Sequence, residues 1–437
     1  MSDWKVFQLG DISESCLGKM LDKRKNKGVY QPYLSNKCVR WGYFDFDYIS
    51  VMKFEDHEKD RYGIIAGDLI ICEGGEPGRC AIWRNEIPGM KIQKALHRLR
   101  VKDGFSTEFL YYRFLLAGRT NFLDKYLIGS TIKHLTGIKL KSIEFTFPEF
   151  KNQQAIAKVL ADLDAKIALN NKINAQLESM ARLLYEYWFV QFDFPDAEGK
   201  PYKSSGGNMV YNEQLKREIP EGWEADCLAA WIKNEKNGDW GKDSVQGNYK
   251  KKVNCIRGAD INGLNGQGSI KAPVRYILEK NSHKILEDGD LVVEISGGSP
   301  TQSTGRLAFI TSATRSRFDT DLICSNFCKA ITLKRKESLF TFVHTWNRLY
   351  NAGVLFDWEG KTSGIKNLLF DAFVAKFEVP QPPVELMEIF NDSVKPLHDK
   401  IQTNLKQNQQ LAALRDWLLP MLMNGQVRVE EEKVAAV

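Results

Sequence analysis

The 437-residue sequence has no run of 18 consecutive apolar residues, so it offers no candidate for a membrane-spanning helix. Its opening stretch, MSDWKVFQLG, lacks the basic-then-apolar pattern of a secretory signal peptide. None of its eight cysteines forms a Cys-x-x-Cys pair, and the closest spacing is that of Cys324 and Cys328. We therefore expect reduced thiols in a cytoplasmic protein, with neither a disulfide framework nor a zinc site.

Motifs for nucleotide binding and for nucleophilic catalysis are missing as well. The segment EGKT at 359–362 resembles the end of a P-loop, but the glycine which that motif requires is replaced by Leu355. The glycine-rich stretches at 72–80 and 296–300 fit no dinucleotide fingerprint and are more simply turns. The sequence thus predicts a chain with no catalytic residue, metal or cofactor of its own.

What the sequence does contain is an internal repeat. The stretch YGIIAGDLIICEGGEPGRCAI (62–82) is echoed by HKILEDGDLVVEISGGSPTQSTGRLAF (283–309), and GSTIKHL (129–135) by KTSGIKNL (361–368). One repeat at so long a period indicates two homologous modules, because solenoid repeats recur every 20–50 residues. The length also favours two or more domains.

Each half has the same internal order. Alternating apolar runs with Gly-Asp turns predict a small sheet-containing module, a proline-marked boundary follows, and a long apolar-striped helix comes last. We therefore expect an α+β fold with two homologous mixed α/β modules separated by two long helices that pack as an antiparallel coiled coil. The expected domains are 1–150 (module 1), 151–195 (central helix), 196–220 (a linker rich in Gly, Pro and Ser), 221–382 (module 2), 383–425 (C-terminal helix) and 426–437 (tail).

Polar residues interrupt both helices at matching places. Alternating steps of four and three from Ile156 visit ten positions, of which eight are apolar and two are Asn170 and Asn174; the same count places Asn404 and Asn408 in the second helix. Each asparagine of the second helix lies 234 residues after its counterpart in the first helix (404 − 170 and 408 − 174). An amide in an apolar seam is destabilising unless a second amide pairs with it, and such pairs fix register. We therefore predict that antiparallel packing sets Asn170 against Asn408 and Asn174 against Asn404.

A simpler alternative is that the asparagines lie where the helix faces solvent, with Leu169 and Ile173 in the core instead. The repetition of the same placement in the second helix disfavours this alternative. Antiparallel helices of 35–40 residues would hold the preceding modules roughly 50–60 Å apart. A split DNA site read by two-fold-related modules would use such a fixed spacing.

Several basic residues are candidates for contacts with double-stranded DNA, although a net charge of +6 only permits such a partner. Two lysine-rich loops favour phosphate contacts, and solvated loops are the alternative. Isolated arginines favour guanine edges, and Lys133 and Lys366 follow Ser/Thr at expected helix starts, where simple N-capping is the alternative. The predicted DNA contacts are Lys23, Arg24, Lys25, Lys27, Arg40, Trp41, Arg79, Lys133, Lys250, Lys251, Lys252, Arg257, Arg306, Arg315, Arg317 and Lys366.

At this point the chain resembles the specificity subunits of type I restriction–modification systems. The resemblance is sharpest at LLYEYWFVQFDFPDAEGKPYKSSGGNMVYNEQLKREIPEGW (183–223), and it extends to WKVFQLGDI (4–12), PYLSNKCVRWGYFDF (32–46) and NQQAIAKVLADLDAKI (152–167). The second half matches less closely, because GWEADCLAAWI (222–232) lacks the Gly-Asp of residues 10–11.

The resemblance implies a non-catalytic subunit whose two target-recognition domains each read one half of a split DNA sequence. It also implies that the helices set the unread spacer and dock two methyltransferase subunits, with restriction and translocation subunits added. S-adenosylmethionine, ATP and Mg²⁺ would then be cofactors of those partners. The Asn/Asp-Pro-Pro-aromatic loop of an adenine methyltransferase is absent here, since the only Pro-Pro lies in QPPVE (381–385). A stand-alone two-headed DNA-binding protein remains the alternative.

Aromatic residues close the first helix, in LLYEYWF (183–189). Local packing against the following segment is the favoured interpretation. The alternative is that Tyr185, Tyr187 or Trp188 anchors the methyltransferase subunit, since aromatic side chains concentrate at interface anchors.

Overall fold

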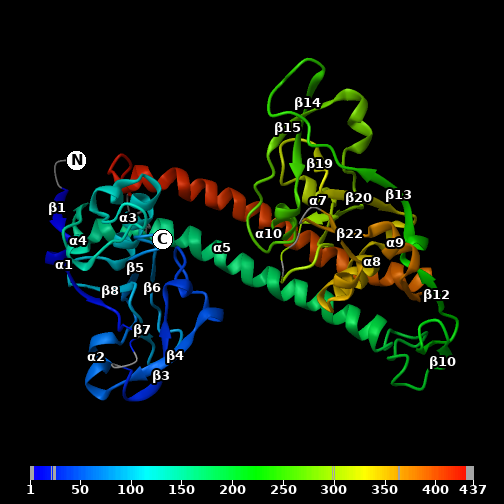
Figure 1. The fold of residues 1–437 in the computed structure, drawn as a ribbon, viewed down its shortest axis with the longest axis horizontal. Coiled ribbons are helices and arrows are strands. Elements are labelled where there is room, and N and C mark those ends of the chain that lie inside the picture. The colour runs from blue at the N-terminus through cyan, green and yellow to red at the C-terminus, as the bar shows by residue number, and fades with distance from the viewer. Residues whose placement is uncertain are drawn as a thin grey trace, which may run out of the picture. The chain divides into compact units, whose positions relative to one another are not determined.

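The computed structural model describes residues 4–20, 22, 26–297, 299, 301–362 and 365–429. Its contacts divide the chain into two compact units (Figure 1). Unit 1 comprises residues 1–166 and 411–437, and unit 2 comprises residues 167–410. Each unit therefore contains one module together with a segment of each long helix.

Unit 1 is built on two small sheets and a strand pair. A four-stranded antiparallel sheet has the order β2-β8-β5-β6, a three-stranded sheet has the order β4-β3-β7, and β1 pairs with β9. The strands are β1 (Lys5–Gln8), β2 (Ser13–Leu17), β3 (Val29–Leu34), β4 (Ser50–Phe54), β5 (Leu69–Cys72), β6 (Cys80–Ile82), β7 (Lys91–Ile92), β8 (Leu96–Val101) and β9 (Glu144–Phe147). The short helices are α1 (Leu9–Ile12), α2 (Lys59–Tyr62), α3 (Thr107–Arg119) and α4 (Gly137–Lys141).

Unit 2 repeats this plan. Its four-stranded sheet has the order β13-β20-β16-β18, its three-stranded sheet has the order β15-β14-β19, and β12 pairs with β23. The strands are β12 (Glu224–Cys227), β13 (Ile232–Asn237), β14 (Tyr249–Ile256), β15 (Val274–Leu278), β16 (Asp290–Glu294), β17 (Ser296–Gly297), β18 (Leu307–Phe309), β19 (Leu322–Cys324), β20 (Cys328–Leu333), β21 (Glu359–Thr362), β22 (Ile365–Leu368) and β23 (Glu378–Gln381). Its short helices are α6 (Ile261–Leu264), α7 (Ser312–Arg315), α8 (Leu339–Asn351) and α9 (Phe370–Lys376).

The two modules correspond in detail, which confirms the predicted duplication and the α+β fold class. In both three-stranded sheets one pair of strands is parallel, β3 with β7 and β14 with β19. Both modules carry a 13-residue helix, α3 or α8, after the four-stranded sheet. Unit 2 adds the small sheet β17-β22-β21.

The repeated Gly-Asp turns have the same function in both modules. Asp68 and Asp290 are each only 1% exposed, and each carboxylate accepts a hydrogen bond of 2.8 Å from the backbone N–H three residues earlier, at Ile65 or Glu287. A cation neutralises each buried carboxylate: Arg100 binds Asp68 through two bonds of 2.8 Å, and Lys236 binds Asp290 at 2.7 Å. The repeated sequence therefore marks a turn that leads into the central strand β5 or β16.

The long helices are α5 (Phe150–Tyr185) and α10 (Val384–Met423). In unit 2, Asn170 Nδ2 donates to Asn408 Oδ1 at 2.8 Å, and Asn404 Nδ2 donates to Asn174 Oδ1 at 2.8 Å. The helix segments are antiparallel there, since the numbering rises along one as it falls along the other. Both predicted contacts are confirmed, and the alternative is excluded because Leu169 is 50% exposed while Asn170 is buried.

In unit 1 an arginine occupies a seam position of α10, and it is paired with a carboxylate. Arg415 NH1 donates to Asp164 Oδ1 on α5 at 2.6 Å, and the other oxygen of that carboxylate accepts the Tyr112 hydroxyl at 2.8 Å. The same unit buries Ile156 and Leu160 of α5 with Leu419 and other apolar residues of α10 in one core. Among the described residues of unit 1, the seam is thus apolar apart from Arg415, which pairs with Asp164.

The segment predicted as a linker at 196–220 is folded. It contains a hairpin of β10 (Met209–Asn212) and β11 (Arg217–Pro220), and Ile219 is buried in the core of unit 2. Just before it, the Asp193 carboxylate accepts the Ser204 N–H at 2.7 Å and the Ser204 hydroxyl at 2.6 Å. Composition predicted a linker because Gly, Pro and Ser residues are frequent in connecting segments, and here these residues form turns. Residues 430–437 of the predicted tail lie outside the described residues.

The aromatic end of α5 is part of the core of unit 2. A π-helical turn, Glu186–Val190, extends the helix, and the rings of Trp188 and Phe189 lie 5.7 and 4.9 Å from that of Phe390 on α10. Tyr185 is also buried, whereas Tyr187 is partly exposed. Packing is therefore the function of Tyr185 and Trp188. None of the helices described is both long and apolar enough to cross a lipid bilayer.

Acidification is expected to destabilise unit 2 through His398 on α10. This imidazole is buried against Phe309, with Thr311 Oγ1 3.4 Å from its Nε2, and burial with the nearby charges of Arg317 and Lys395 lowers its pKa to about 3. The unfolded chain takes up a proton below about pH 6.5 and the folded chain does not, so stability falls as the pH drops from 6.5 towards 3, by up to about 1.4 kcal/mol per pH unit. Urea unfolding at several pH values measures this slope.

A matched pair of variants isolates that contribution. His398→Gln removes one titrating group from the core and should make the slope between pH 6.5 and 4 shallower, while the buried His344, whose pKa burial lowers to about 4, keeps part of it. His283→Gln removes an exposed imidazole of the same unit and should leave the slope unchanged. Equal slopes in all three proteins would contradict the assignment to His398.

Candidate nucleic-acid interface

The basic loop of module 1 is only partly described. Lys23, Arg24 and Lys25 lie outside the described residues, and Lys27 is exposed just before β3. On the adjoining strands, the Lys53 ammonium lies 5.2 Å from the ring centre of the exposed Tyr30. This end of the β3-β4 pair therefore presents cations and an aromatic ring to solvent.

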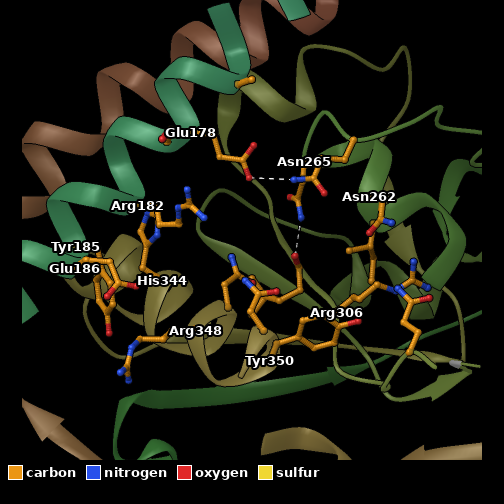
Figure 2. A pocket seen from close by; sticks show the side chains of 18 residues that line it. Glu178, Arg182, Tyr185, Glu186, Asn262, Asn265, Arg306, His344, Arg348 and Tyr350 are labelled. Atoms are coloured by element: carbon orange, nitrogen blue, oxygen red, sulfur yellow. Dashed lines mark hydrogen bonds between the residues drawn. The ribbon is translucent and has the colours of Figure 1, made fainter. Parts of the chain in front are cut away.

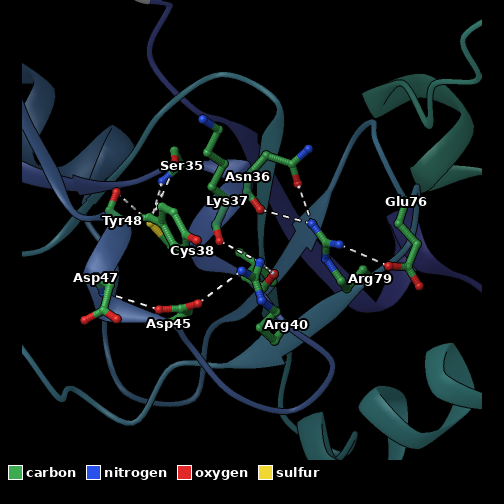
Figure 3. A network of polar contacts seen from close by, with 11 residues as sticks. Ser35, Asn36, Lys37, Cys38, Arg40, Asp45, Asp47, Tyr48, Glu76 and Arg79 are labelled. Carbon is green, nitrogen blue, oxygen red and sulfur yellow. Dashed lines mark hydrogen bonds and ion pairs between the residues drawn. The ribbon is translucent and has the colours of Figure 1, made fainter. Parts of the chain in front are cut away.

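A second candidate in module 1 is a cationic hollow of about 320 Å³, shown with its polar network in Figure 3. Each of its two arginines donates a hydrogen bond to a neighbouring carboxylate. Arg79 NH1 donates to Glu76 at 3.0 Å, and Arg40 NH2 donates to Asp45 at 3.0 Å. The hollow is lined by Asn36, Lys37, Arg40, Tyr48 and Arg79.

Those internal bonds restrict what the arginines can do. Arg79 NH2 donates to both the backbone and the side-chain oxygen of Asn36, at 3.1 and 3.2 Å. Arg40 NH1 donates to the Lys37 carbonyl at 2.6 Å, and the Trp41 indole donates to Glu76 at 2.6 Å. Arg40, Trp41 and Arg79 are thus rigidly placed, and a bidentate guanine contact would require Arg79 to exchange present partners.

Module 2 presents its lysines along one strand. Lys250 and Lys252 are both exposed on β14, whose pairing register shifts between Tyr249 and Lys251, while Lys251 lies 3.8 Å from Glu279. Lys252 also borders a hollow of about 620 Å³ together with Arg315. Arg315 is 41% exposed and holds Asp321 only loosely, at 3.7 Å. Lys252 and Arg315 are the cations of module 2 best placed for a phosphate.

Other predicted arginines are occupied by internal partners. Arg306 binds the buried Glu294 through two bonds of 2.9 and 2.7 Å, and Arg257 binds Asp260 in the same bidentate manner at 2.8 and 3.2 Å. Breaking such a pair is strongly destabilising when the carboxylate is buried, because it leaves a buried charge without a partner. The prediction of base contacts at Arg257 and Arg306 gains no support from this geometry.

Arg317 lies inside unit 2 and attaches module 2 to α10. Its NH1 donates to Gln402 Oε1 on α10 at 2.7 Å and to the Leu264 carbonyl at 3.1 Å. Burial lowers the pKa of this guanidinium to about 10. Its position corrects the prediction of a base contact, which required a surface side chain.

Lys133 and Lys366 do not lie at helix starts as predicted. Lys366 is on strand β22, paired with Glu359 at 2.9 Å, and its ammonium lies 4.9 Å from the Phe356 ring centre. Lys133 lies in the loop before α4 and pairs with Asp124 at 3.3 Å. The Ser/Thr residues before them suggested helix caps, but the following segments form a loop and a strand.

One group of possible metal ligands occurs among the described residues, at Glu55, His57 and Glu58. The Glu58 carboxylate already accepts bonds from Lys19 Nζ at 2.5 Å and from the Glu55 N–H at 2.9 Å. A cation would have to displace the Lys19 ammonium, so we assign no metal site there.

The sequence reasoning missed an exposed apolar stripe on each long helix. Met180 and Leu183 face solvent on α5 in unit 2, and the exposed Tyr187 follows on the π-helical turn. Leu414 and Trp417 face solvent on α10 in unit 1. The two stripes occupy equivalent positions of the repeat, since 414 − 180 and 417 − 183 both equal 234, the separation of the paired asparagines. A second count in steps of three and four along each helix could have found them.

Another cavity borders α5 and α8 in unit 2. It has a volume of about 600 Å³, and Figure 2 shows it with charged and amide side chains around it. Arg182 and Arg348 are on its wall, and neither has a hydrogen-bond or ion-pair partner among the described residues. Unpaired arginines at this end of the molecule were not predicted from the sequence.

Comparisons with known proteins agree with these observations. Residues 1–179 match the family model described as the type I restriction modification DNA specificity domain. The MjaIX specificity subunit of Methanocaldococcus jannaschii, a type I restriction enzyme component, is 25% identical over 98% of this chain and 94% of its own length. The HindI specificity subunit of Haemophilus influenzae is 23% identical over 98% of this chain and its full length.

A solved structure shows a similar fold. The type I restriction–modification S subunit from M. genitalium has a TM-score of 0.58 at 16% identity, covering 96% of each chain. The likeness thus extends over both modules and both long helices.

Proposed function

We propose that the chain is a specificity subunit of a type I restriction–modification system and supplies the DNA sequence specificity of such a complex. The duplication carries this proposal: two modules of the same plan, each beside its segments of the long helices, suit the reading of two half-sites. We propose that each module reads one half of a bipartite sequence. Lys27 and Lys53 in module 1 and Lys250, Lys252 and Arg315 in module 2 are the proposed phosphate contacts.

We further propose that the paired helices set the length of the unread spacer. Buried asparagine pairs support this. If the helices slip along each other, the buried amides lose their partners, so every other register is less stable. A fixed register gives the helix pair a fixed length, which a spacer of constant length requires.

The two apolar stripes support docking of two methyltransferase subunits. Exposed apolar groups at equivalent positions of a repeat suit two copies of one partner, and aromatic residues such as Trp417 anchor interfaces. Methyl transfer, and cleavage where restriction subunits join, would take place in those partners. S-adenosylmethionine, ATP and Mg²⁺ would be bound there, and this chain would contribute no catalytic group.

Methylome sequencing tests the function directly. A host that expresses the chain with its methyltransferase partner should acquire adenine methylation at an asymmetric sequence split by a constant gap. Methylation that occurs without the chain, or at an uninterrupted sequence, would refute the proposal. Tight and specific DNA binding by the chain alone would favour a stand-alone DNA-binding protein instead.

Neutralising Lys252 and Arg315 should weaken DNA binding without changing the sequence preference. A Lys252→Gln/Arg315→Gln variant loses up to two phosphate contacts, so the slope of log affinity against log salt should become shallower by up to about 2. Fluorescence anisotropy of the assembled complex at several salt concentrations measures this slope for matched and mismatched duplexes.

Lys336→Gln provides the control, because Lys336 is an exposed lysine of the same module outside the hollow. An equal change of slope in that variant would show that only net charge matters. A loss confined to the matched duplex would mean that one of the two cations contacts a base.

A further inference from the structure

Two arginines without counter-ions converge on one small recess of unit 2. Arg217 on β11 and Arg348 on α8 both line a hollow of about 200 Å³ at the end of α5, beside Tyr185. Neither guanidinium has a hydrogen-bond or ion-pair partner within the part of the chain that the structure describes. Figure 2 shows Arg348 with Tyr185 and Glu186 from the side of the neighbouring cavity.

A buried hydroxyl without a partner faces the same recess. Thr341 lines it, is 1% exposed, and its Oγ1 has no hydrogen-bond partner among the described residues. Thr345, one turn further along α8, is satisfied differently: its hydroxyl donates to the Thr341 carbonyl at 2.8 Å and meets the Tyr185 hydroxyl at 2.9 Å. Thr341, Thr345 and Arg348 share one face of α8 through the spacing i, i+4, i+7.

The charges around the recess are unbalanced. Burial and the neighbouring charge of Arg348 both lower the pKa of Arg217, so the two cations are close enough to repel each other. Glu378 also lines the recess and Glu186 lies near Tyr185, but neither carboxylate comes within ion-pair distance of either arginine among the described contacts. Two guanidinium groups and one unsatisfied hydroxyl form a donor set that an oxyanion would complete.

The walls of the recess favour a carboxylate on a protein over a phosphate of DNA. Phe189, Trp223 and Pro380 contribute apolar surface beside the arginines. A duplex presents its phosphates on a wide, stiff surface, whereas an acidic side chain is slender enough to enter a small hollow.

We propose that Arg217, Arg348 and Thr341 form a receptor for an aspartate or glutamate side chain of the methyltransferase subunit. The identity of this partner rests on the proposed function. The donor set itself rests only on unit 2, so the two can be tested separately. The site would add a charged anchor to the surface through which unit 2 contacts that partner.

The first experiment uses the full chain alone, with inorganic phosphate as the probe. Phosphate should raise the melting temperature of the native chain more than that of Arg217→Gln/Arg348→Gln. Arg335→Gln is the matched charge control and should behave like the native chain, because Arg335 is exposed in the same unit and its guanidinium has no partner in the part of the chain that the structure describes. Equal phosphate responses in the native chain and the double variant would overturn the oxyanion site.

The second experiment uses the complex with the methyltransferase. Arg217→Lys and Arg348→Lys keep the charge and supply an amine, which a carbodiimide couples to a carboxylate in contact. Mass spectrometry should find a cross-link from one of these lysines to an acidic residue of the partner. The Arg217→Gln/Arg348→Gln variant should lose partner affinity by at least about tenfold, as for a truncated charge pair at an interface.

The outcomes separate the two proposals. Native complex formation with neither a cross-link nor an affinity loss overturns the carboxylate receptor and leaves the proposed function standing. A phosphate response without a cross-link identifies the site as one for a free oxyanion and overturns the choice of partner. Failure of the native chain to bind any methyltransferase overturns the proposed function, and with it the assignment of this partner.

Discussion

Removing seven facing residues from each long helix, 163–169 and 409–415, is expected to shorten the gap of the methylated sequence or to abolish methylation. Seven residues correspond to about 10 Å of helix, which is the rise of about three base pairs of B-DNA. The half-site sequences should not change, because no residue of either module is deleted. The hydrogen-bonded Asn171 and Asn408 then take the positions of Asp164 and Arg415 beside Tyr112. Methylome sequencing of cells carrying the shortened chain reads both quantities together.

Abolition is the larger of the two expected effects. Three base pairs also rotate one half-site by about a quarter to a third of a turn relative to the other, since B-DNA repeats every 10–10.5 base pairs. Deleting four residues from each helix is the control: the step no longer matches the heptad, so the seam is broken and the chain itself should be destabilised. An unchanged gap after the seven-residue deletion would refute the proposal that the helices set the spacer.

Replacing one asparagine of a buried pair should be more harmful than replacing both. Asn174→Leu leaves the buried Asn404 amide without its acceptor, which should lower the free energy of unfolding by about 1–3 kcal/mol. In Asn174→Leu/Asn404→Leu the seam becomes apolar, so stability should return to the native value or exceed it. The Asn174 Nδ2 group already lacks a partner, which favours the double variant further.

Urea unfolding of the native chain, both single variants and the double variant gives the coupling free energy of the pair. Gln176→Leu, at an exposed position of the same helix, is the control for added apolar surface. Additive effects of the two single substitutions would mean that the pair does not set the register. We also expect the double variant to lose spacer uniformity, since an apolar seam tolerates slippage.

The helix register could be predicted from the sequence because the duplication supplied the missing partner. A single polar seam in one helix is ambiguous, as the alternative placement of Leu169 and Ile173 shows. The same polar positions in a second helix identify which amides meet, and the hydrogen bonds of Asn170 and Asn174 follow from that one comparison. The Gly-Asp turns were found in the same way, by repetition.

Which arginines have internal partners and which remain accessible could not be predicted, because the partners are distant in sequence. Arg317 is held by Gln402, which lies 85 residues away, and Arg79 by Asn36, which lies 43 residues away. Arginine residues in a loop-rich module look alike in the sequence whether they bind a neighbouring strand or a nucleic acid. Only the folded module distinguishes Arg315, which remains accessible, from Arg317, which does not.

The division of the chain into its units has a consequence for biosynthesis. Unit 2 is one uninterrupted stretch, 167–410, whereas the core of unit 1 includes Leu419, Leu422 and Met423 from the last helix. The ribosome therefore finishes everything that unit 2 needs before it makes the residues that close unit 1. A nascent chain usually folds its N-terminal domain first, but here the earliest-made module must wait for the final turns of α10. A premature stop codon near residue 410 would thus destabilise unit 1, which contains the N-terminal module, more than unit 2.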